Sequence, residues 1–247
     1  VGAVDTDISP YDSGSYASAT TYATGNAVLK ACSMLREKIQ AFGAGMLELP
    51  VEDTRFDGVC VTGQGRQVSL AEIAVQATCG NVQELQAAGS FSSMISPPPY
   101  MAGLAEVEID PETGSVEVTD YVAVVDCGTS VNPNLVRVQT EGGIVQGIGM
   151  ALTEEVQYTD TGRIRNNSFM QYKIPSRMDV GQIRVEFESS YEQSGPFGAK
   201  SIGELVIDTP CPAIADAVYN AVGVRIRELP ITPEKIGMGI AQGRQEV

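Results

Sequence analysis

The first third of the chain has a clear helical pattern. Apolar side chains recur three or four residues apart between residues 24 and 40, at Ala27, Val28, Ala31, Met34, Leu35 and Ile39. This spacing predicts a helix over residues 24–40 with one apolar face. Gly43 and Gly45 follow the last apolar position, and we expect them to end the helix.

The next segment is typical of a hairpin followed by a second helix. Residues 55–61 and 65–68 carry the β-branched and aromatic side chains of short strands on either side of a glycine-containing turn. Ser69 and Glu72 then form the pattern of a capping box, in which each side chain accepts from the other residue's backbone N–H. The pattern predicts a helix over residues 69–77.

The second half of the chain mixes strands and helices without strict alternation. Alternating residues on both sides of 111–114 predict a hairpin. Further patterns predict a buried strand at 122–125, a helix at 135–152, a strand at 184–188 and a helix at 214–222. Residues 80–96 are small and polar and precede Pro97-Pro98-Pro99, so we expect a boundary near residue 97. The mixture favours an α+β fold.

Charge and length exclude some classes of protein. The chain has 247 residues and a net charge of −15, which argues against binding to nucleic acid or anionic membranes because phosphate contacts need clustered Lys and Arg. No apolar run approaches the roughly 18–20 residues of a membrane span, and no signal peptide is apparent. We therefore expect a cytoplasmic protein. Because the sequence begins at Val1, we expect a fragment, or a processed or split subunit.

The missing residue types restrict the chemistry. The chain has no histidine, which excludes a Ser-His-Asp triad, a His-ligated zinc and a histidine base. Acid–base chemistry must use Glu, Asp, Lys, Tyr or Cys. The five cysteines are far apart and form no Cys-x-x-Cys pair, so we expect no iron–sulfur cluster on this chain and free buried thiols instead.

One glycine-rich segment carries a candidate general base. Residues 195–204 read Gly-Pro-Phe-Gly-Ala-Lys-Ser-Ile-Gly-Glu, so Glu204 follows a backbone that ligands can approach closely. A carboxylate desolvated there could have its pKa raised towards working pH. The same residues also fit a plain turn before a helix, with Glu204 at the positive helix end.

A second glycine-rich segment spans residues 126–155. It contains Asp126-Cys-Gly-Thr-Ser-Val-Asn-Pro and then Gln139-Thr-Glu-Gly-Gly-Ile-Val-Gln-Gly-Ile-Gly. Together with residues 200–204 and the small-residue segment 14–28, it resembles the molybdenum hydroxylases of the xanthine dehydrogenase and aldehyde oxidoreductase family. The similarity runs from about residue 4 to 236 and covers the second half of the molybdopterin-binding subunit.

The resemblance implies a role for each candidate residue. It implies that Glu204 is the catalytic base and that no residue of the chain ligates molybdenum directly. The implied cofactor contacts are Ser18, Thr20, Thr21, Gln139, Lys200, Ser201 and Gly203, and the implied substrate pocket contains Tyr16 and Ala17. Plainer alternatives remain for three of them. Tyr16 also fits a surface aromatic residue, and Gln139 also fits a helix-capping or solvent-facing amide. Lys200 could instead form an ion pair with one of the 31 acidic residues.

The implied fold is the second molybdopterin-binding domain of this family, with two subdomains, 1–96 and 97–237, and a tail, 238–247. The implied activity is oxidation of an N-heterocycle such as a purine or nicotinate, or of an aldehyde, with oxygen from water. The cofactor would be the cytosine dinucleotide form of molybdopterin. Iron–sulfur and FAD centres would lie on partner chains, and another chain would supply the other half of the molybdenum-binding subunit. The chain alone should be inactive. The alternative is a non-catalytic or cofactor-assembly protein that retains the fold.

Overall fold

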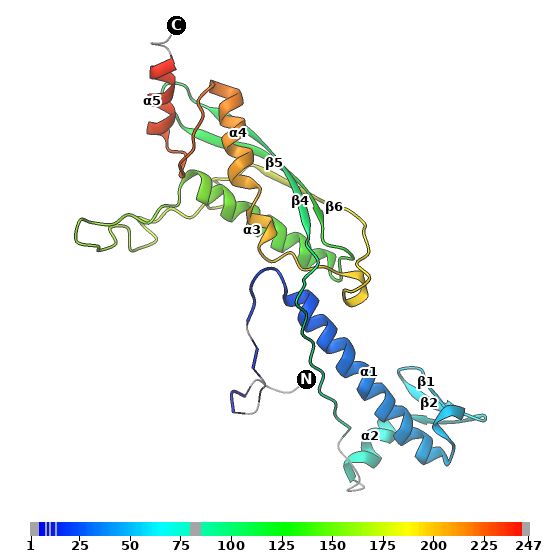
Figure 1. Ribbon diagram of the computed structural model, residues 1–247. Coiled ribbons are helices and arrows are strands. Elements are labelled where there is room, and N and C mark those ends of the chain that lie inside the picture. The colour runs from blue at the N-terminus through cyan, green and yellow to red at the C-terminus, as the bar shows by residue number, and fades with distance from the viewer. Residues whose placement is uncertain (1–4, 8, 10, 13, 80–84, 244–247) are drawn as a thin grey trace. The chain divides into compact units, whose positions relative to one another are not determined.

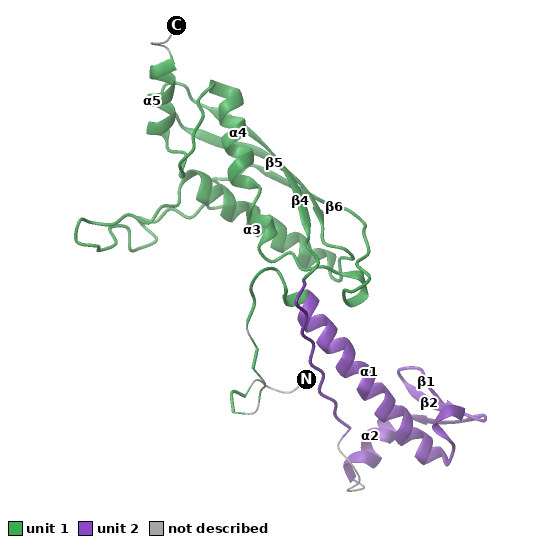
Figure 2. Cartoon of the chain, in the orientation of Figure 1, with its two compact units in different colours: residues 1–21, 96–247 green, residues 22–95 purple. Residues whose placement is uncertain are grey.

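The computed structural model describes residues 5–7, 9, 11–12, 14–79 and 85–243. The chain divides into two compact units, residues 22–95 and residues 1–21 together with 96–247 (Figure 2). The expected subdomains place residues 1–21 with the N-terminal part, whereas the compact units group them with the C-terminal part. The glycine-rich segments and Glu204 all lie in the second of these units.

The unit of residues 22–95 contains a long helix, a small sheet and a short helix. Its elements are α1 (Thr20–Leu47), the 3₁₀ helix η1 (Val51–Asp53), β1 (Arg55–Phe56), β2 (Cys60–Gly63), β3 (Arg66–Ser69) and α2 (Leu70–Cys79). The three strands pair antiparallel in the order β1-β2-β3. A core of Ile39, Leu47, Phe56, Val61, Val68 and Ile73 lies between the helices and the sheet.

Helix α1 is longer than predicted. It begins at Thr20 and continues through Gly43 and Gly45 to Leu47, so the predicted end at these glycines is wrong. A Cβ atom on Gly43 would lie 2.6 Å from the Val61 side chain. Gly43 therefore serves close packing of the helix on the sheet, because the buried contact outweighs the intrinsic cost of glycine in a helix.

Helix α2 begins with the predicted capping box. The Ser69 N–H donates to Glu72 Oε2 at 2.8 Å, and the Glu72 N–H donates to Ser69 Oγ at 3.2 Å. The structure thus confirms both the box and the helix. Part of the predicted linker, residues 80–84, lies outside the described residues, and residues 85–95 have no regular secondary structure.

The second unit is built on one sheet. Its strands are β4 (Tyr100–Ile109), β5 (Val116–Asp126) and β6 (Gln182–Phe187), in the order β4-β5-β6. Strands β4 and β5 form the predicted antiparallel hairpin, with a register shift between Glu106 and Val107. Strand β6 runs parallel to β5. The helices are α3 (Pro133–Leu152), α4 (Pro210–Val222) and α5 (Pro233–Gly243), with short 3₁₀ helices η2 (Pro196–Gly198) and η3 (Leu205–Ile207).

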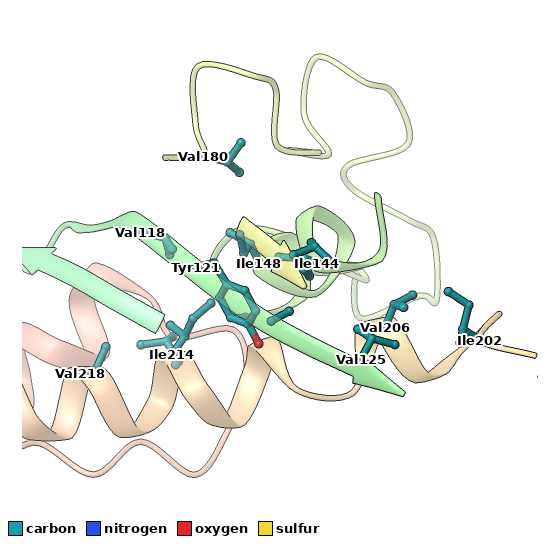
Figure 3. Close-up of a cluster of buried hydrophobic side chains, with 14 of the residues drawn as sticks. Val118, Tyr121, Val125, Ile144, Ile148, Val180, Ile202, Val206, Ile214 and Val218 are labelled. Atoms are coloured by element: carbon teal, nitrogen blue, oxygen red, sulfur yellow. The ribbon is translucent and has the colours of Figure 1, made fainter. Parts of the chain in front are cut away.

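Helices α3 and α4 cover one face of this sheet (Figure 1). Figure 3 shows the buried side chains between them, among them Tyr121 and Val125 of β5, Ile144 and Ile148 of α3, and Ile214 and Val218 of α4. The Tyr121 hydroxyl and the Thr209 hydroxyl lie 2.8 Å apart at the start of α4. The arrangement confirms the predicted α+β fold.

The small residues of α3 have a packing role. A Cβ atom on Gly143 would lie 2.1 Å from the Val206 side chain, and one on Gly147 would lie 2.6 Å from Pro210. These glycines let α3 approach the segment that follows Glu204. The glycine stripe is therefore a contact between elements of the core, whereas Gln139, Gly142 and Gln146, which lie beside the stripe on α3, are exposed.

Residues 238–243, expected as part of a tail, continue helix α5, in which Ile236 is fully buried. Residues 244–247 lie outside the described part of the chain. Among the helices that the structure describes, none has the length and apolar character needed to cross a membrane.

Candidate functional site

Glu204 lies at the mouth of a pocket. It is exposed and sits directly before η3. The pocket has a volume of about 360 Å³ and is lined by Ala17, Ser18, Ser96, Pro97, Pro98, Pro99, Glu204, Leu205 and Asp208. The Glu204 N–H donates to Ser18 Oγ at 2.8 Å. Two segments that lie 186 positions apart in the sequence are joined by this bond, as expected if both belong to one site.

The segment that carries Ser18 is a tight turn before α1. Ala17 and Ser18 both have left-handed backbone angles, with φ of 48° and 49°. The Ala19 N–H closes the turn by donating to the Tyr16 carbonyl oxygen at 3.2 Å. Two successive left-handed residues other than glycine are unusual and mark a strained conformation.

The other candidates of this segment do not reach Glu204 in the described structure. Tyr16 is 60% exposed. Thr20 donates its hydroxyl to Ser15 Oγ at 2.9 Å, and Thr21 is exposed in the first turn of α1. The structure therefore brings Ala17 and Ser18 to the pocket and leaves the Tyr16, Thr20 and Thr21 side chains outside its lining.

Gln139 contacts the same site from α3. Its Nε2 donates to the Gly203 carbonyl oxygen at 2.8 Å, and this bond leaves the Gln139 carbonyl oxygen facing away as an acceptor. A Cβ atom on Gly203 would meet only Ser18, at 3.8 Å. Neither packing nor backbone angle requires glycine there, so the residue leaves an open strip of backbone beside Glu204.

Lys200 and Ser201 belong to the framework of the site. The Lys200 side chain is 8% exposed and its Nζ lies 2.6 Å from Asp126 Oδ2. Ser201 is 3% exposed. Of the two interpretations of Lys200, the ion pair is thus the one present in the structure.

Asp126 is held by several donors at the end of β5. Its Oδ1 accepts from the Gly128 N–H at 3.0 Å and from the Ser190 hydroxyl. Partial burial acts to raise the pKa of Asp126, but the hydrogen bonds from Lys200, Ser190 and Gly128 outweigh it and hold the pKa below its usual value. The Asp126 carboxylate is therefore charged at neutral pH and fixes the ends of two loops.

Asp208 is a second carboxylate of the pocket that the sequence analysis missed. It lies four residues after Glu204, and the 3₁₀ helix η3 between them brings both to the same opening. The spacing alone gave no signal, because a single Asp in a polar stretch is ordinary for a surface turn.

The cysteines differ from expectation in their exposure. All five are free, but Cys32 and Cys79 are exposed and only Cys127 is buried. In the parts of the chain that the structure describes, no group of three or more His, Cys, Asp or Glu side chains could hold a metal ion.

The residues at the pocket fit a molybdopterin. A pterin edge has both donors and acceptors, and the Gln139 amide together with the Ser18 hydroxyl can serve both. The open backbone at Gly203 allows a planar ligand to approach closely. The chain would thus contact the organic part of the cofactor.

Comparison with known proteins identifies the family. Residues 1–181 match the model of the molybdopterin cofactor-binding domain. The chain is 38% identical over 236 residues to a probable hypoxanthine oxidase of Escherichia coli, with 94% of this chain and 25% of that protein covered. It is 34% identical to the gamma subunit of the 6-hydroxypseudooxynicotine dehydrogenase complex of Paenarthrobacter nicotinovorans, with 94% and 31% covered.

A solved structure agrees with these matches. Quinoline 2-oxidoreductase of Pseudomonas putida 86 superposes with a TM-score of 0.82 at 30% identity, over 96% of this chain and 32% of that chain. The fold is that of a cofactor-binding domain of molybdenum hydroxylases. The chain belongs to the molybdopterin cofactor-binding domain family, which confirms the resemblance found in the sequence. It spans about a quarter to a third of the length of these relatives.

Proposed function

We propose that this chain is the part of a molybdenum hydroxylase that binds molybdopterin and supplies the catalytic base, Glu204. The single observation that supports this best is the contact between Glu204 and Ser18, beside the open backbone of Gly203. It places an acid and a hydroxyl in one pocket and an open stretch of backbone next to the acid. A non-catalytic descendant would not need that acid.

The chain's own residues have distinct tasks in this proposal. Gln139 and Ser18 would hold the cofactor through hydrogen bonds, and the open backbone of Gly203 would allow it to approach closely. When bound, the cofactor supplies the two-electron oxidation chemistry. The Glu204 carboxylate removes a proton from the oxygen nucleophile, which must lie within about 3 Å of it. Since Glu204 is exposed in this chain, another chain or domain must exclude water from the site.

The proposed substrate is an N-heterocycle or an aldehyde. The relatives named above have hypoxanthine, 6-hydroxypseudooxynicotine and quinoline in their names, and each of these molecules contains a nitrogen heterocycle. The proposal also includes the cytosine dinucleotide form of the cofactor and iron–sulfur and FAD centres on partner chains. It includes as well the other half of the molybdenum-binding subunit, two subdomains divided near residue 97, and a cytoplasmic location.

Two measurements test the proposal. The first is the molybdenum and pterin content of the protein purified with the chains that accompany it, where we expect about one molybdenum per complex. The second compares Glu204→Gln with Asp208→Asn, since both carboxylates are exposed in one pocket. Glu204→Gln should lower kcat by about 10²–10⁴-fold, and Asp208→Asn should have a much smaller effect.

The outcomes separate the alternatives. A complex free of molybdenum even after reconstitution would favour a non-catalytic or assembly protein. If Asp208→Asn abolished turnover while Glu204→Gln did not, the base would be Asp208. Glu186→Gln, which changes an exposed carboxylate on β6, controls for the loss of a surface charge.

A further inference from the structure

The segment that ends in Glu204 is anchored at every residue. Ala199 forms a β-bridge with Gly128, and the Lys200 N–H donates to the Cys127 carbonyl oxygen at 2.8 Å. Ser201 and Ile202 are buried. The last two anchors are the Gln139 bond to the Gly203 carbonyl oxygen and the Ser18 bond to the Glu204 N–H.

One of these anchors is ionic and nearly buried. Lys200 Nζ lies 2.6 Å from Asp126 Oδ2 and 5.2 Å from the centre of the Tyr100 ring. The side chains of Lys200 and Asp126 are 8% and 23% exposed. Asp126 is the last residue of β5, and Tyr100 is the first residue of β4. The pair therefore ties the Glu204 segment to the end of the central hairpin.

The Asp126 carboxylate also fixes the two loops that contain Gly128 and Ser190. Besides Lys200, it accepts from the Gly128 N–H and the Ser190 hydroxyl. Gly128 in turn lies against the Gly198 carbonyl oxygen, which accepts from the Thr129 N–H at 2.8 Å. A nearly buried ion pair with additional hydrogen bonds has one favourable geometry, so it is suited to specifying position.

The Lys200 side chain contacts residues outside the Glu204 pocket. Its ammonium group is occupied by Asp126 and Tyr100, and it is not among the described residues that line the pocket of Glu204. To contact a phosphate of the cofactor, it would have to leave Asp126 as an unpaired charge in a mostly buried place, which is strongly unfavourable.

We propose that Lys200 and Asp126 are positioning residues that hold the segment 199–204, and with it the Glu204 carboxylate, in place through their ion pair. The part of this inference that concerns catalysis rests on the proposed function of Glu204. The part that concerns anchoring of the segment does not. The two parts can therefore fail separately.

The test uses Lys200→Met, Asp126→Asn and the double variant, each purified with the accompanying chains. Hydrogen exchange of the amides of residues 200–204 should become at least about tenfold faster in both single variants, while exchange in α4 stays unchanged. Because each single change already breaks the pair, the double variant should exchange no faster than either single variant. Asp216→Asn, which removes the carboxylate of the exposed Arg225 ion pair, is the matched control and should change nothing in 200–204.

Molybdenum content and kinetics of the same variants test the link to catalysis. We expect unchanged molybdenum content, a kcat lower by about 100-fold because Glu204 is misplaced, and an unchanged KM. Unchanged exchange of residues 200–204 in both single variants would overturn the anchoring. Loss of molybdenum in Lys200→Met alone, with full content and activity in Asp126→Asn, would instead make Lys200 a cofactor contact. A wild-type protein without molybdenum would refute the proposed function, while the exchange data would still decide the anchoring.

Discussion

Two segments contribute to the Glu204 pocket as walls, one ending in Glu204 and one containing Ala17 and Ser18, and they are held in different ways. Residues 199–204 run through the core, with Ala199, Ser201 and Ile202 buried and Lys200 in an ion pair. The other wall, residues 15–18, of which Ala17 and Ser18 line the pocket, is mostly exposed. Its bond to the Glu204 segment is that of the Glu204 N–H to Ser18 Oγ. The position of Glu204 is thus set mainly by the sheet and helices, and Ser18, which adds one anchor to it, is itself held by fewer contacts.

The backbone strain in the second wall exceeds what its hydrogen bond to Glu204 returns. Each left-handed residue other than glycine costs about 1–2 kcal/mol, and Ala17 and Ser18 are both left-handed. A hydrogen bond such as that of Ser18 returns only about 0.5–1.5 kcal/mol. The turn therefore gains from further contacts, which a bound cofactor or a partner chain would provide. The wall that ends in Glu204 is therefore a fixed frame, whereas the wall that contains Ser18 depends on additional contacts for its stability.

The largest expected difference between the walls is at their glycines. Gly128 has a φ of +66°, and a Cβ there would lie 2.3 Å from the Gly198 carbonyl oxygen. Gly128→Ala should destabilise the protein by about 3 kcal/mol, from backbone strain and from the clash with a fixed carbonyl group. Gly14 is the matched control, since it has a φ of +87° but open space around it.

Denaturant unfolding measures both changes. Gly14→Ala should cost no more than about 1 kcal/mol, from backbone strain alone. Equal destabilisation by the two variants would show that the backbone around Gly128 accommodates an added Cβ atom as easily as the exposed wall does. That result would contradict the distinction between a fixed wall and an exposed wall.

Acid should loosen the fixed wall through Asp126. Its pKa in the folded protein lies below the ordinary value of 3.8, so below pH 3.8 the unfolded chain binds more protons at this group than the folded protein does. The stability from this carboxylate is therefore fully present above pH 3.8 and is lost as the pH falls through the folded pKa.

The difference between wild type and Asp126→Asn isolates this contribution from other carboxylates. At pH 7 the variant should be less stable by about 2 kcal/mol, the usual range for hydrogen bonds to a charged group. Unfolding curves between pH 7 and pH 2.5 should converge at the acid end. Parallel curves over the whole range would mean that the Asp126 charge does not hold the loops.

The secondary structure was easier to predict from the sequence than the contacts of the site. Periodicity located the β4–β5 hairpin and α2, because each depends on local patterns such as the Ser69 and Glu72 box. It ended α1 too early because the contact of Gly43 with Val61 is tertiary.

The candidate site shows the same limit. The resemblance drew attention to Glu204, Ser18 and Gln139, and the structure brings these three together. Sequence similarity does not tell which way a side chain points: the resemblance implies that Lys200 is a cofactor contact, and in the structure Lys200 forms an ion pair with Asp126. Asp208 was missed because its place in the pocket depends on η3 and on the turn at residue 17.

A smaller effect is expected where α3 supports the fixed wall. Gln139→Glu replaces the donor to the Gly203 carbonyl oxygen with a carboxylate that repels it, so it should cost about 1 kcal/mol and speed exchange of residues 203–204. Gln146→Glu makes the same change on the exposed face of α3 and should be close to neutral. Equal effects of the two variants would indicate that only the added negative charge on α3 matters.

The smallest change should come from the exposed wall. Ser18→Ala removes the acceptor of the Glu204 N–H, and because this bond is exposed to water, the loss in stability should be about 0.5 kcal/mol. The Glu204 amide should nevertheless exchange faster, and molybdenum content should fall if Ser18 also contacts the cofactor. Ser15→Ala is the matched control, since Ser15 accepts from the Thr20 hydroxyl and not from the Glu204 segment. If Ser18→Ala destabilised the protein as much as Gly128→Ala, the Ser18 segment would be part of the frame, and the division of the pocket into a fixed and a dependent wall would be wrong.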